Sequence, residues 1–207
     1  NGCNLAFMNA FANVIVSEGL YDRKFVEEHT VGFEEWWKTV EKYTPEAVAD
    51  ITGIEPEMMR KAARMYATSP NSVIGWGMGV TQQCQGVHTV HQIAAVACIS
   101  NQIGRDAAGL APVRGQNNVQ GSCDMGMWPD LYPGYQKIDN PAAREKFAKV
   151  WGVPVEKLSD RPGYKLTDLP HGVKEGKIRA FYNFGEDPLQ TEPDSADMRE
   201  TLENLDL

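Results

Sequence analysis

A helix-rich α/β fold is predicted by three features of this 207-residue sequence. Residues 1–70 are almost entirely helical in pattern. A short apolar run at Ser72–Trp76 is followed by a glycine-spaced turn and a strong helix pattern at Val87–Ile103, which together make half of a βαβ unit. A second β-like run, Lys177–Phe184, is also followed by a glycine-bearing loop. Strands that alternate with helices in this way are typical of α/β proteins.

The first seventy residues predict five helices. The apolar run Ala6–Val16 could be taken for the core of a signal peptide. It lacks a basic leader, however, and Asn9 and Asn13 interrupt it, so a buried helix is the better interpretation. Asp22 and Thr44 are placed to cap the helices that follow them. The predicted bounds are Leu5–Glu18, Arg23–His29, Phe33–Lys42, Pro45–Ile51 and Glu55–Thr68.

The second half of the chain is less regular in pattern. Between Arg105 and Tyr135 the residues show little periodicity but many Gly, Asn and Gln, and a long irregular stretch inside a compact chain is often functional. A soft domain boundary is expected near Gly115–Gly121. Three further helices are predicted at Pro141–Val150, Leu166–Val173 and Ser195–Leu205.

Composition and charge exclude several classes of function. The formal net charge of −8, without a stripe of Lys or Arg, argues against nucleic-acid binding, which requires a basic surface. No stretch of about 18 apolar residues exists, so no membrane insertion by this segment is expected. The four cysteines match no zinc or iron–sulfur spacing, and unpaired thiols are the expected state.

Two loops are candidate ligand sites because each follows a predicted strand. In open α/β sheets, ligands bind beyond the carboxyl ends of the strands, and glycine lets the backbone approach a ligand closely. The loops are Gly77–Gln82 and Gly185–Thr191. Neither matches the glycine patterns of nicotinamide or P-loop nucleotide sites, and simple connections between elements are the alternative interpretation.

A third candidate is the polar segment Arg114–Gly121, which carries one cation and four side-chain amides in eight residues. Amides both donate and accept hydrogen bonds, and a guanidinium offers a planar fork to a carboxylate or phosphate. A solvated surface loop is the alternative. His88 and His91 lie three residues apart, a spacing that can hold a metal, but no third ligand is near in sequence. We therefore assign no metal ligand.

Taken together, these segments resemble the large subunits of formate dehydrogenases, within the molybdopterin oxidoreductase (dimethyl sulfoxide reductase-like) superfamily. The resemblance is carried by Pro112–Gly121 (PVRGQNNVQG) with Cys123–Gly126 (CDMG). It extends over the whole chain in the same order through the segments Asn13–Tyr21, Gly77–Gln82, Asp130–Tyr135 and Gly185–Thr191. Nitrate reductases share the architecture but differ through the Arg-Gly-Gln-Asn-Asn segment.

The resemblance implies a fold and a cofactor. It implies that residues 1–116 are the C-terminal part of a Rossmann-like, three-layer dinucleotide-binding lobe and that residues 117–207 begin a second α/β, pterin-binding lobe. The implied cofactor is molybdenum or tungsten held by two molybdopterin guanine dinucleotides. Arg114 and Gln116 match positions at the substrate, where the arginine would hold formate. The positions that match cofactor contacts are Met78, Gly79, Gln82, Gly185, Asp187 and Thr191.

The resemblance also implies what lies outside this segment. The family's metal ligand, a cysteine or selenocysteine followed by histidine, has no counterpart here, and neither does its 4Fe-4S cluster. We therefore expect a fragment that is inactive alone, with formate and carbon dioxide as substrates of the full subunit. The expected partners are the remaining parts of the catalytic subunit and an iron–sulfur electron-transfer subunit.

Two alternatives remain open at this point. One is another molybdopterin oxidoreductase, of the nitrate or arsenic-oxyanion type. The other is a noncatalytic assembly or binding module with the same fold. The residues do not fix the compartment, although the cytoplasm is favoured over the periplasm.

Overall fold

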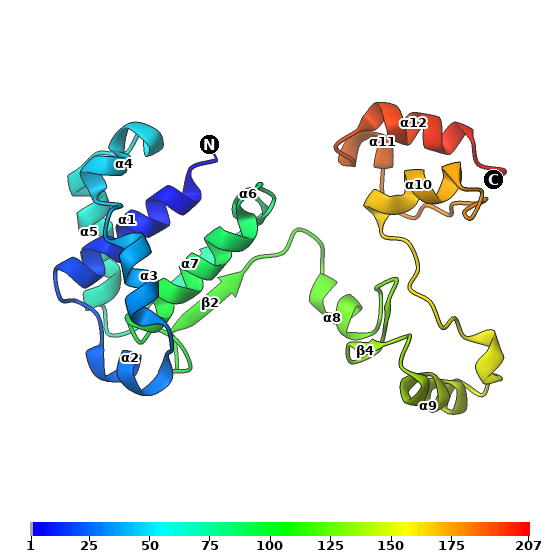
Figure 1. Ribbon diagram of the computed structural model, residues 1–207, viewed down its shortest axis with the longest axis horizontal. Coiled ribbons are helices and arrows are strands. Elements are labelled where there is room, and N and C mark those ends of the chain that lie inside the picture. Colours follow the sequence, from blue (N-terminus) through cyan, green and yellow to red (C-terminus); the bar gives the residue numbers. More distant parts are fainter. Residues whose placement is uncertain (1) are drawn as a thin grey trace. The chain divides into compact units, whose positions relative to one another are not determined.

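The residues before the first strand form five helices, as the spacing of their apolar residues predicts (Figure 1). The computed structural model describes residues 2–207. Two predicted caps are confirmed: the Asp22 carboxylate accepts from the Phe25 N–H at 2.9 Å, and the Thr44 hydroxyl accepts from the Ala47 N–H at 3.2 Å. The helices are α1 (Asn4–Ser17), α2 (Arg23–His29), α3 (Phe33–Val40), α4 (Pro45–Thr52) and α5 (Pro56–Thr68).

Helix α1 is the central helix of this region and contacts α3, α4, α5 and α7 (Gly86–Ile99). Its apolar residues are buried in the main core, together with Asn9 and Asn13. The Asn13 amide donates to the carbonyl of Val40 at 3.3 Å and to that of Glu41 at 2.8 Å, so it satisfies backbone acceptors at the end of α3. The interpretation of this run as a buried helix is therefore confirmed.

The predicted half of a βαβ unit is present and is completed by a strand that the sequence did not predict. Strand β1 (Val73–Trp76) is followed by the short helix α6 (Met78–Thr81), then by α7, and then by β2 (Gly109–Pro112). The two strands are parallel, in a register that pairs Val73 with Gly109 and Trp76 with Pro112. The expectation of little regular structure after Arg105 was wrong here. The sequence Gly-Leu-Ala-Pro has weak β preference, and pairing with β1 makes it a strand.

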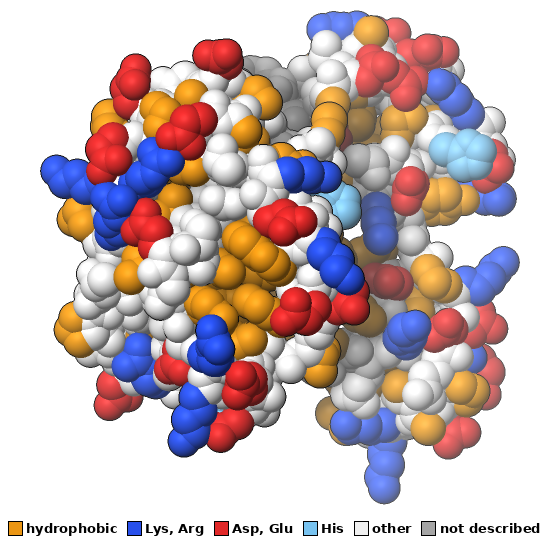
Figure 2. Space-filling model, turned by 60° about the vertical axis from the view of Figure 1, so that its left-hand side comes forward, with side chains coloured by type: hydrophobic (Ala, Val, Ile, Leu, Met, Phe, Trp, Pro, Cys, Tyr) orange, Lys and Arg blue, Asp and Glu red, His pale blue; other side chains and the backbone are white. Residues whose placement is uncertain are grey.

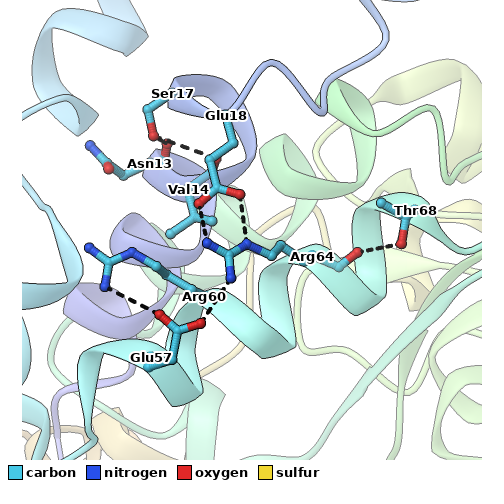
Figure 3. Close-up of polar contacts among 8 residues, drawn as sticks. All are labelled: Asn13, Val14, Ser17, Glu18, Glu57, Arg60, Arg64 and Thr68. Atoms are coloured by element: carbon cyan, nitrogen blue, oxygen red, sulfur yellow. Dashed lines mark hydrogen bonds and ion pairs between the residues drawn. The ribbon is translucent and has the colours of Figure 1, made fainter.

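A cluster of ion pairs joins the end of α1 to α5 (Figure 3), and a further pair joins α5 to α4. The Arg64 guanidinium lies between two carboxylates, with 2.8 Å from Nε to Glu18 and 2.9 Å from Nη1 to Glu57. Arg60 pairs with Glu46 in the same region. The Arg64 side chain is 43% exposed and that of Glu18 30% exposed, so solvent screens the pair and its contribution to stability is small.

The chain divides into two units after Asn117. Unit 1 contains the elements from α1 to β2. Unit 2 runs from Asn118 to Leu207, and its first helix begins after Asn118, which has a left-handed φ of 51°. The observed division falls one residue from the predicted boundary between Gln116 and Asn117.

Unit 2 consists of short elements around two small cores. One core is formed by Tyr132, Ile138, Ala143 and Phe147, and the other by Leu169, Val173 and Met198. The three predicted helices are present. The elements are α8 (Val119–Asp124), β3 (Leu131–Tyr132), β4 (Gln136–Lys137), α9 (Pro141–Trp151), the 3-10 turns η1 (Val155–Lys157) and η2 (Leu166–Asp168), α10 (Leu169–Lys174), α11 (Pro188–Thr191) and α12 (Ser195–Glu203).

The predicted strand Lys177–Phe184 is not a strand in this structure, and that prediction was wrong for the chain by itself. Lys177 and Ile178 donate to the carbonyl of Gly172, and Phe181 donates to that of Leu207, but no regular ladder forms. A strand is stabilised by a neighbour that takes its N–H and C=O groups, and within residues 2–207 this run makes backbone bonds only with Gly172 and with residues 206 and 207.

The surface carries charges of both signs. On the face that Figure 2 shows, Lys and Arg side chains are interspersed with Asp and Glu rather than gathered into a stripe. None of the helices within residues 2–207 is both long and apolar enough to cross a bilayer.

Candidate functional site

The parallel pairing of β1 and β2 brings two chain segments together at one edge of the sheet. Residues Gly77–Gln82 leave the carboxyl end of β1, and Val113 and Arg114 leave that of β2. The Val113 N–H donates to the carbonyl of Trp76 at 2.7 Å, which continues the pairing one residue past the strands. A pocket of about 440 Å³ opens there, which we call the strand-exit pocket. It is lined by Trp76, Gly77, Met78, Thr81, Gln82, Val90, Pro112, Val113 and Arg114.

Glycine at one position permits the backbone to take this shape. It is not Gly77, where a Cβ would meet the Val113 carbonyl oxygen at 3.8 Å, an ordinary contact distance. A Cβ on Gly86, the first residue of α7, would lie only 2.1 Å from the carbonyl oxygen of Thr81. The backbone of α7 therefore approaches that of Thr81 more closely than any residue with a Cβ would allow. This tight turn between α6 and α7 places Thr81 and Gln82 at the pocket.

The side chains of the pocket suit an anionic, partly apolar ligand. Arg114 is exposed, and its guanidinium makes no hydrogen bond or ion pair within residues 2–207. It is therefore free to hold a carboxylate or phosphate through its planar fork. Met78 is 41% exposed and supplies apolar surface, while Gln82 adds an exposed amide. At the wall, the indole N–H of Trp76 is buried and has no partner among the described residues.

Three of the eight predicted site residues come together in this pocket: Met78, Gln82 and Arg114. Gly79 lies in α6 but does not line the pocket, and Gln116 is an exposed residue two positions beyond Arg114. The structure adds Trp76, Gly77, Thr81, Val90, Pro112 and Val113 as lining residues. Gly77 and Thr81 were inside the predicted loop, and Pro112 and Val113 were inside the segment that carries the resemblance. Trp76 and Val90 were named in no candidate site, because their place at the pocket follows from the packing of the strands and α7.

The other three predicted residues lie together in unit 2, in the loop before and within α11. Gly185 has a left-handed φ of 70°. The Asp187 carboxylate accepts from the Leu189 N–H at 3.2 Å and from the Gln190 side-chain amide at 2.8 Å, so it caps α11. The Thr191 hydroxyl donates to the carbonyl of Asp187 at 3.1 Å. An ionised carboxylate accepts about four hydrogen bonds, so Asp187 retains capacity for a ligand.

Metal-binding side chains do not gather within the described part of the chain. Among residues 2–207, no group of three or more His, Cys, Asp or Glu side chains is placed to hold a metal ion. His88 and His91 are both exposed on α7. The four cysteines are free thiols, and the Cys84 thiol, which follows the pocket loop, is exposed.

Comparison with known proteins identifies the family. The family model described as "Molybdopterin oxidoreductase" matches residues 1–207, so the chain belongs to the molybdopterin oxidoreductase family. It is 53% identical over 207 residues to formate dehydrogenase H of Escherichia coli, and the match covers 100% of this chain and 29% of that protein. It is 38% identical over 206 residues to the F420-dependent formate dehydrogenase 1 subunit alpha of Methanococcus maripaludis, covering 100% of this chain and 30% of that protein.

A solved structure shares the fold. Acetylene hydratase from Pelobacter acetylenicus superimposes with a TM-score of 0.66 at 24% identity, covering 100% of this chain and 30% of that one. This likeness shows the fold alone. The chain thus spans about 30% of the length of the relatives that it matches.

Membership of the family implies a molybdopterin cofactor with molybdenum or tungsten. The strand-exit pocket could hold part of such a group. Its volume of about 440 Å³ suits a portion of a large ligand, the Arg114 guanidinium is committed to no carboxylate of the described chain, and the space around Gly79 and Gly115 is open.

Proposed function

We propose that this chain is part of the catalytic subunit of a formate dehydrogenase that holds molybdenum or tungsten in a bis(molybdopterin guanine dinucleotide) cofactor. The reaction is the two-electron interconversion of formate and carbon dioxide. The observation that carries the proposal is the unpaired Arg114 guanidinium at a pocket shared with Met78 and Gln82. The 53% identity to a protein named formate dehydrogenase H supports the choice of substrate.

Arg114 is proposed to bind the formate carboxylate. Formate has only one carbon and two oxygens, so a planar fork that takes both oxygens also fixes the direction of the C–H bond. A fixed cation further stabilises negative charge on those oxygens as the reaction proceeds. Gln116, two residues further along the chain, is proposed to line the same substrate site with its amide.

Two loops are proposed to hold the cofactor, one in each unit. Met78, Gly79 and Gln82 would contact a pterin nucleotide at the carboxyl end of β1, where glycine leaves room for it. In unit 2, Gly185, Asp187 and Thr191 would contact a nucleotide portion. Asp187 can accept hydrogen bonds from a guanine edge or a ribose hydroxyl with the capacity that remains beyond its capping bonds. The bound cofactor supplies the two-electron redox chemistry.

The chain is proposed to act only as part of the full subunit. The proposed partners are the remaining parts of that subunit, including its 4Fe-4S cluster, and an iron–sulfur electron-transfer subunit. The share of about 30% of the relatives' length supports this, because the residues that hold the metal must then lie elsewhere.

The test is Arg114→Lys in the full-length subunit. Lysine keeps the charge but loses the planar fork, so we expect kcat/KM for formate to fall by about 100-fold, which corresponds to about 3 kcal/mol of transition-state stabilisation. Metal and pterin content, measured on the same preparation, should stay at the wild-type level.

Arg161→Lys is the matched control, because the Arg161 side chain is 92% exposed and its one ion pair within residues 2–207 is a 3.8 Å contact with Asp160. It should leave both kinetics and cofactor content unchanged. Wild-type kinetics in Arg114→Lys would remove Arg114 from the substrate site. A normal cofactor with turnover of nitrate or an arsenic oxyanion, but not of formate, would replace the proposed substrate.

A further inference from the structure

The two four-residue helices α6 and α11 both end in a threonine, but the two hydroxyls have different partners. In α11, the Thr191 hydroxyl donates to the carbonyl of Asp187, four residues earlier, at 3.1 Å. In α6, the Thr81 hydroxyl donates to the sulfur of Met78, three residues earlier, at 3.5 Å. The same residue type at the same place in a short helix therefore directs its hydroxyl differently.

Thr81 is the exception among the helical threonines of residues 2–207. In a helix, a threonine hydroxyl ordinarily donates to the carbonyl four residues earlier, because that acceptor lies within its reach. The six other threonines within α-helices all do so, and they are Thr39, Thr52, Thr68, Thr89, Thr191 and Thr201.

The backbone does not hold the Thr81 hydroxyl. The carbonyl four residues before it belongs to Gly77 and accepts from the Val80 N–H at 3.2 Å. A hydroxyl has one hydrogen, and in Thr81 that hydrogen is directed to the Met78 sulfur. A thioether sulfur is a weak acceptor, so an oxygen atom that enters the pocket is a better partner for this donor.

The position of Thr81 in the strand-exit pocket gives this donor access to a ligand. Thr81 carries the one hydroxyl among the residues that line the pocket, between the apolar side chains of Met78 and Val90 and the amide of Gln82. Its backbone is fixed by the tight turn, since its carbonyl oxygen faces Gly86 at a distance that no Cβ tolerates. A donor on a fixed backbone loses little freedom when a ligand binds, which favours binding.

We propose that Thr81 is a further ligand-binding residue of this pocket: its hydroxyl leaves the Met78 sulfur when the ligand binds and donates to an oxygen atom of the bound pterin nucleotide. The inference rests on the proposed function, because that function supplies the ligand. The exchange also releases the Met78 thioether, which then packs against the ligand as apolar surface.

Retention of the pterin by the full-length subunit tests this proposal. Thr81→Val keeps the shape of the side chain without the hydroxyl, and Thr81→Ser keeps the hydroxyl. On dilution, we expect Thr81→Val to lose pterin about 10-fold faster than the wild type and Thr81→Ser to stay within about two-fold, as the loss of one hydrogen bond predicts. The released pterin is followed by its fluorescence. Equal retention in Thr81→Val and the wild type would overturn the proposal, and so would equally fast loss from both variants.

Thr39→Val is the matched control. It makes the same chemical change at an exposed threonine whose hydroxyl donates to the Glu35 carbonyl, so it should retain pterin as the wild type does. Fast loss from this control would contradict a specific role for Thr81. The Tm of each variant is measured alongside. If Thr81→Val does not fold, Thr81→Ala carries the same prediction, because alanine also lacks the hydroxyl and favours a helix.

A double-mutant cycle with Met78→Leu separates a direct bond to the ligand from an effect through the sulfur. Leucine keeps the apolar bulk of Met78 but offers no acceptor to Thr81. If the hydroxyl bonds to the ligand, Thr81→Val should accelerate pterin loss by about 10-fold in this background as well. Disappearance of the effect would show that Thr81 acts only by orienting Met78 and would overturn the direct bond.

Formate turnover, measured on the same preparations, separates this inference from the proposed function. A wild-type subunit that holds pterin without turning over formate would reject the proposed substrate, while the difference between Thr81→Val and Thr81→Ser would still decide the role of Thr81. Formate turnover together with equal pterin retention in all variants would keep the proposed function and reject the inference.

Discussion

The two glycine-bearing loops have similar sequence patterns but differ in the backbone segments that precede them. Gly77–Gln82 leaves a strand that is paired, and the neighbouring strand places Val113 and Arg114 against it. Gly185–Thr191 leaves an extended run that makes two backbone bonds with residues 206 and 207 but forms no ladder. The loop is shaped by the Asp187 cap and by the hydrogen bond from the Thr191 hydroxyl.

The comparison shows that a loop pattern alone does not build a pocket. The strand-exit pocket needs two segments that are 30 or more residues apart in the sequence, and the parallel sheet brings them together. The loop in unit 2 contacts α12 and the small core next to it, but no paired strand supports it within the described residues. We therefore expect this loop to be the more easily perturbed by changes in its own side chains.

The largest expected effect tests the sheet-supported loop. In Gly86→Ala, the added Cβ would clash with the Thr81 carbonyl oxygen at 2.1 Å, so the turn between α6 and α7 must shift. We expect a loss of about 3 kcal/mol in the free energy of unfolding, measured by urea denaturation. Gly79→Ala is the control: no atom lies within 4 Å of its Cβ, and alanine favours a helix. A control as unstable as Gly86→Ala would contradict the steric argument.

A smaller effect is expected in the loop that depends on its caps. Asp187→Ala removes the acceptor for the Leu189 N–H, which should cost about 1 kcal/mol in local stability. Hydrogen exchange of the α11 amides should become about five-fold faster, and the exchange rates of the amides that line the strand-exit pocket of unit 1 should not change. Asp187→Asn keeps a capping oxygen and should retain most of the protection. If the α11 amides exchange as slowly in Asp187→Ala as in Asp187→Asn, the Asp187 cap does not stabilise this loop.

The stability of unit 1 should depend on pH through the capping carboxylate of Asp22. Hydrogen bonds from the Phe25 N–H and the Asn101 amide hold the pKa of Asp22 below its ordinary value. The pKa is lower in the folded state, so this stabilisation is complete above the unfolded pKa of about 3.9 and is lost as the pH falls through the lower folded pKa. Unfolding followed from pH 6 to pH 2.5 should show this loss, and Asp22→Asn should reduce it. An identical pH profile in the variant would exclude Asp22 as a source.

The smallest expected effect concerns the ion pairs of α1 and α5. The hydrogen-bonded Arg64 guanidinium holds the pKa of Glu18 below its ordinary value, but both side chains are partly exposed. Arg64→Gln should therefore cost much less than Gly86→Ala, and added salt should reduce the difference from the wild type. A loss near that of Gly86→Ala would show that this cluster, rather than the close turn at Thr81, sets the stability of unit 1.

Much of unit 1 could be predicted because its cues are local. Capping by Asp22 and Thr44 and the apolar run of α1 depend on residues within a few positions of one another. Strand β2 was missed because its four residues carry no β pattern and acquire their form from β1. Lys177–Phe184 failed in the opposite way: its pattern is that of a strand, but a strand exists only with a partner.

Part of the candidate site could be anticipated from the sequence. Arg114 stood out by residue type and the loop Gly77–Gln82 by its place after a strand, while Met78 and Gln82 were named through the family resemblance. The pocket that these residues share depends on the pairing of β1 with β2, which no local pattern predicts. The lining by Val90 comes from the packing of α7 over the strands, which likewise depends on distant contacts.

Arg114 lies one residue beyond Val113, which makes the last backbone bond between the two strand segments. The Arg114 side chain makes no hydrogen bond or ion pair within residues 2–207. Exchanging it should thus leave folding almost untouched, in contrast to the glycine at the start of α7. Evolution can try new side chains at such a position without rebuilding the scaffold beneath. A substitution at this position can therefore alter the charge and shape of the pocket while the strand pairing stays as it is.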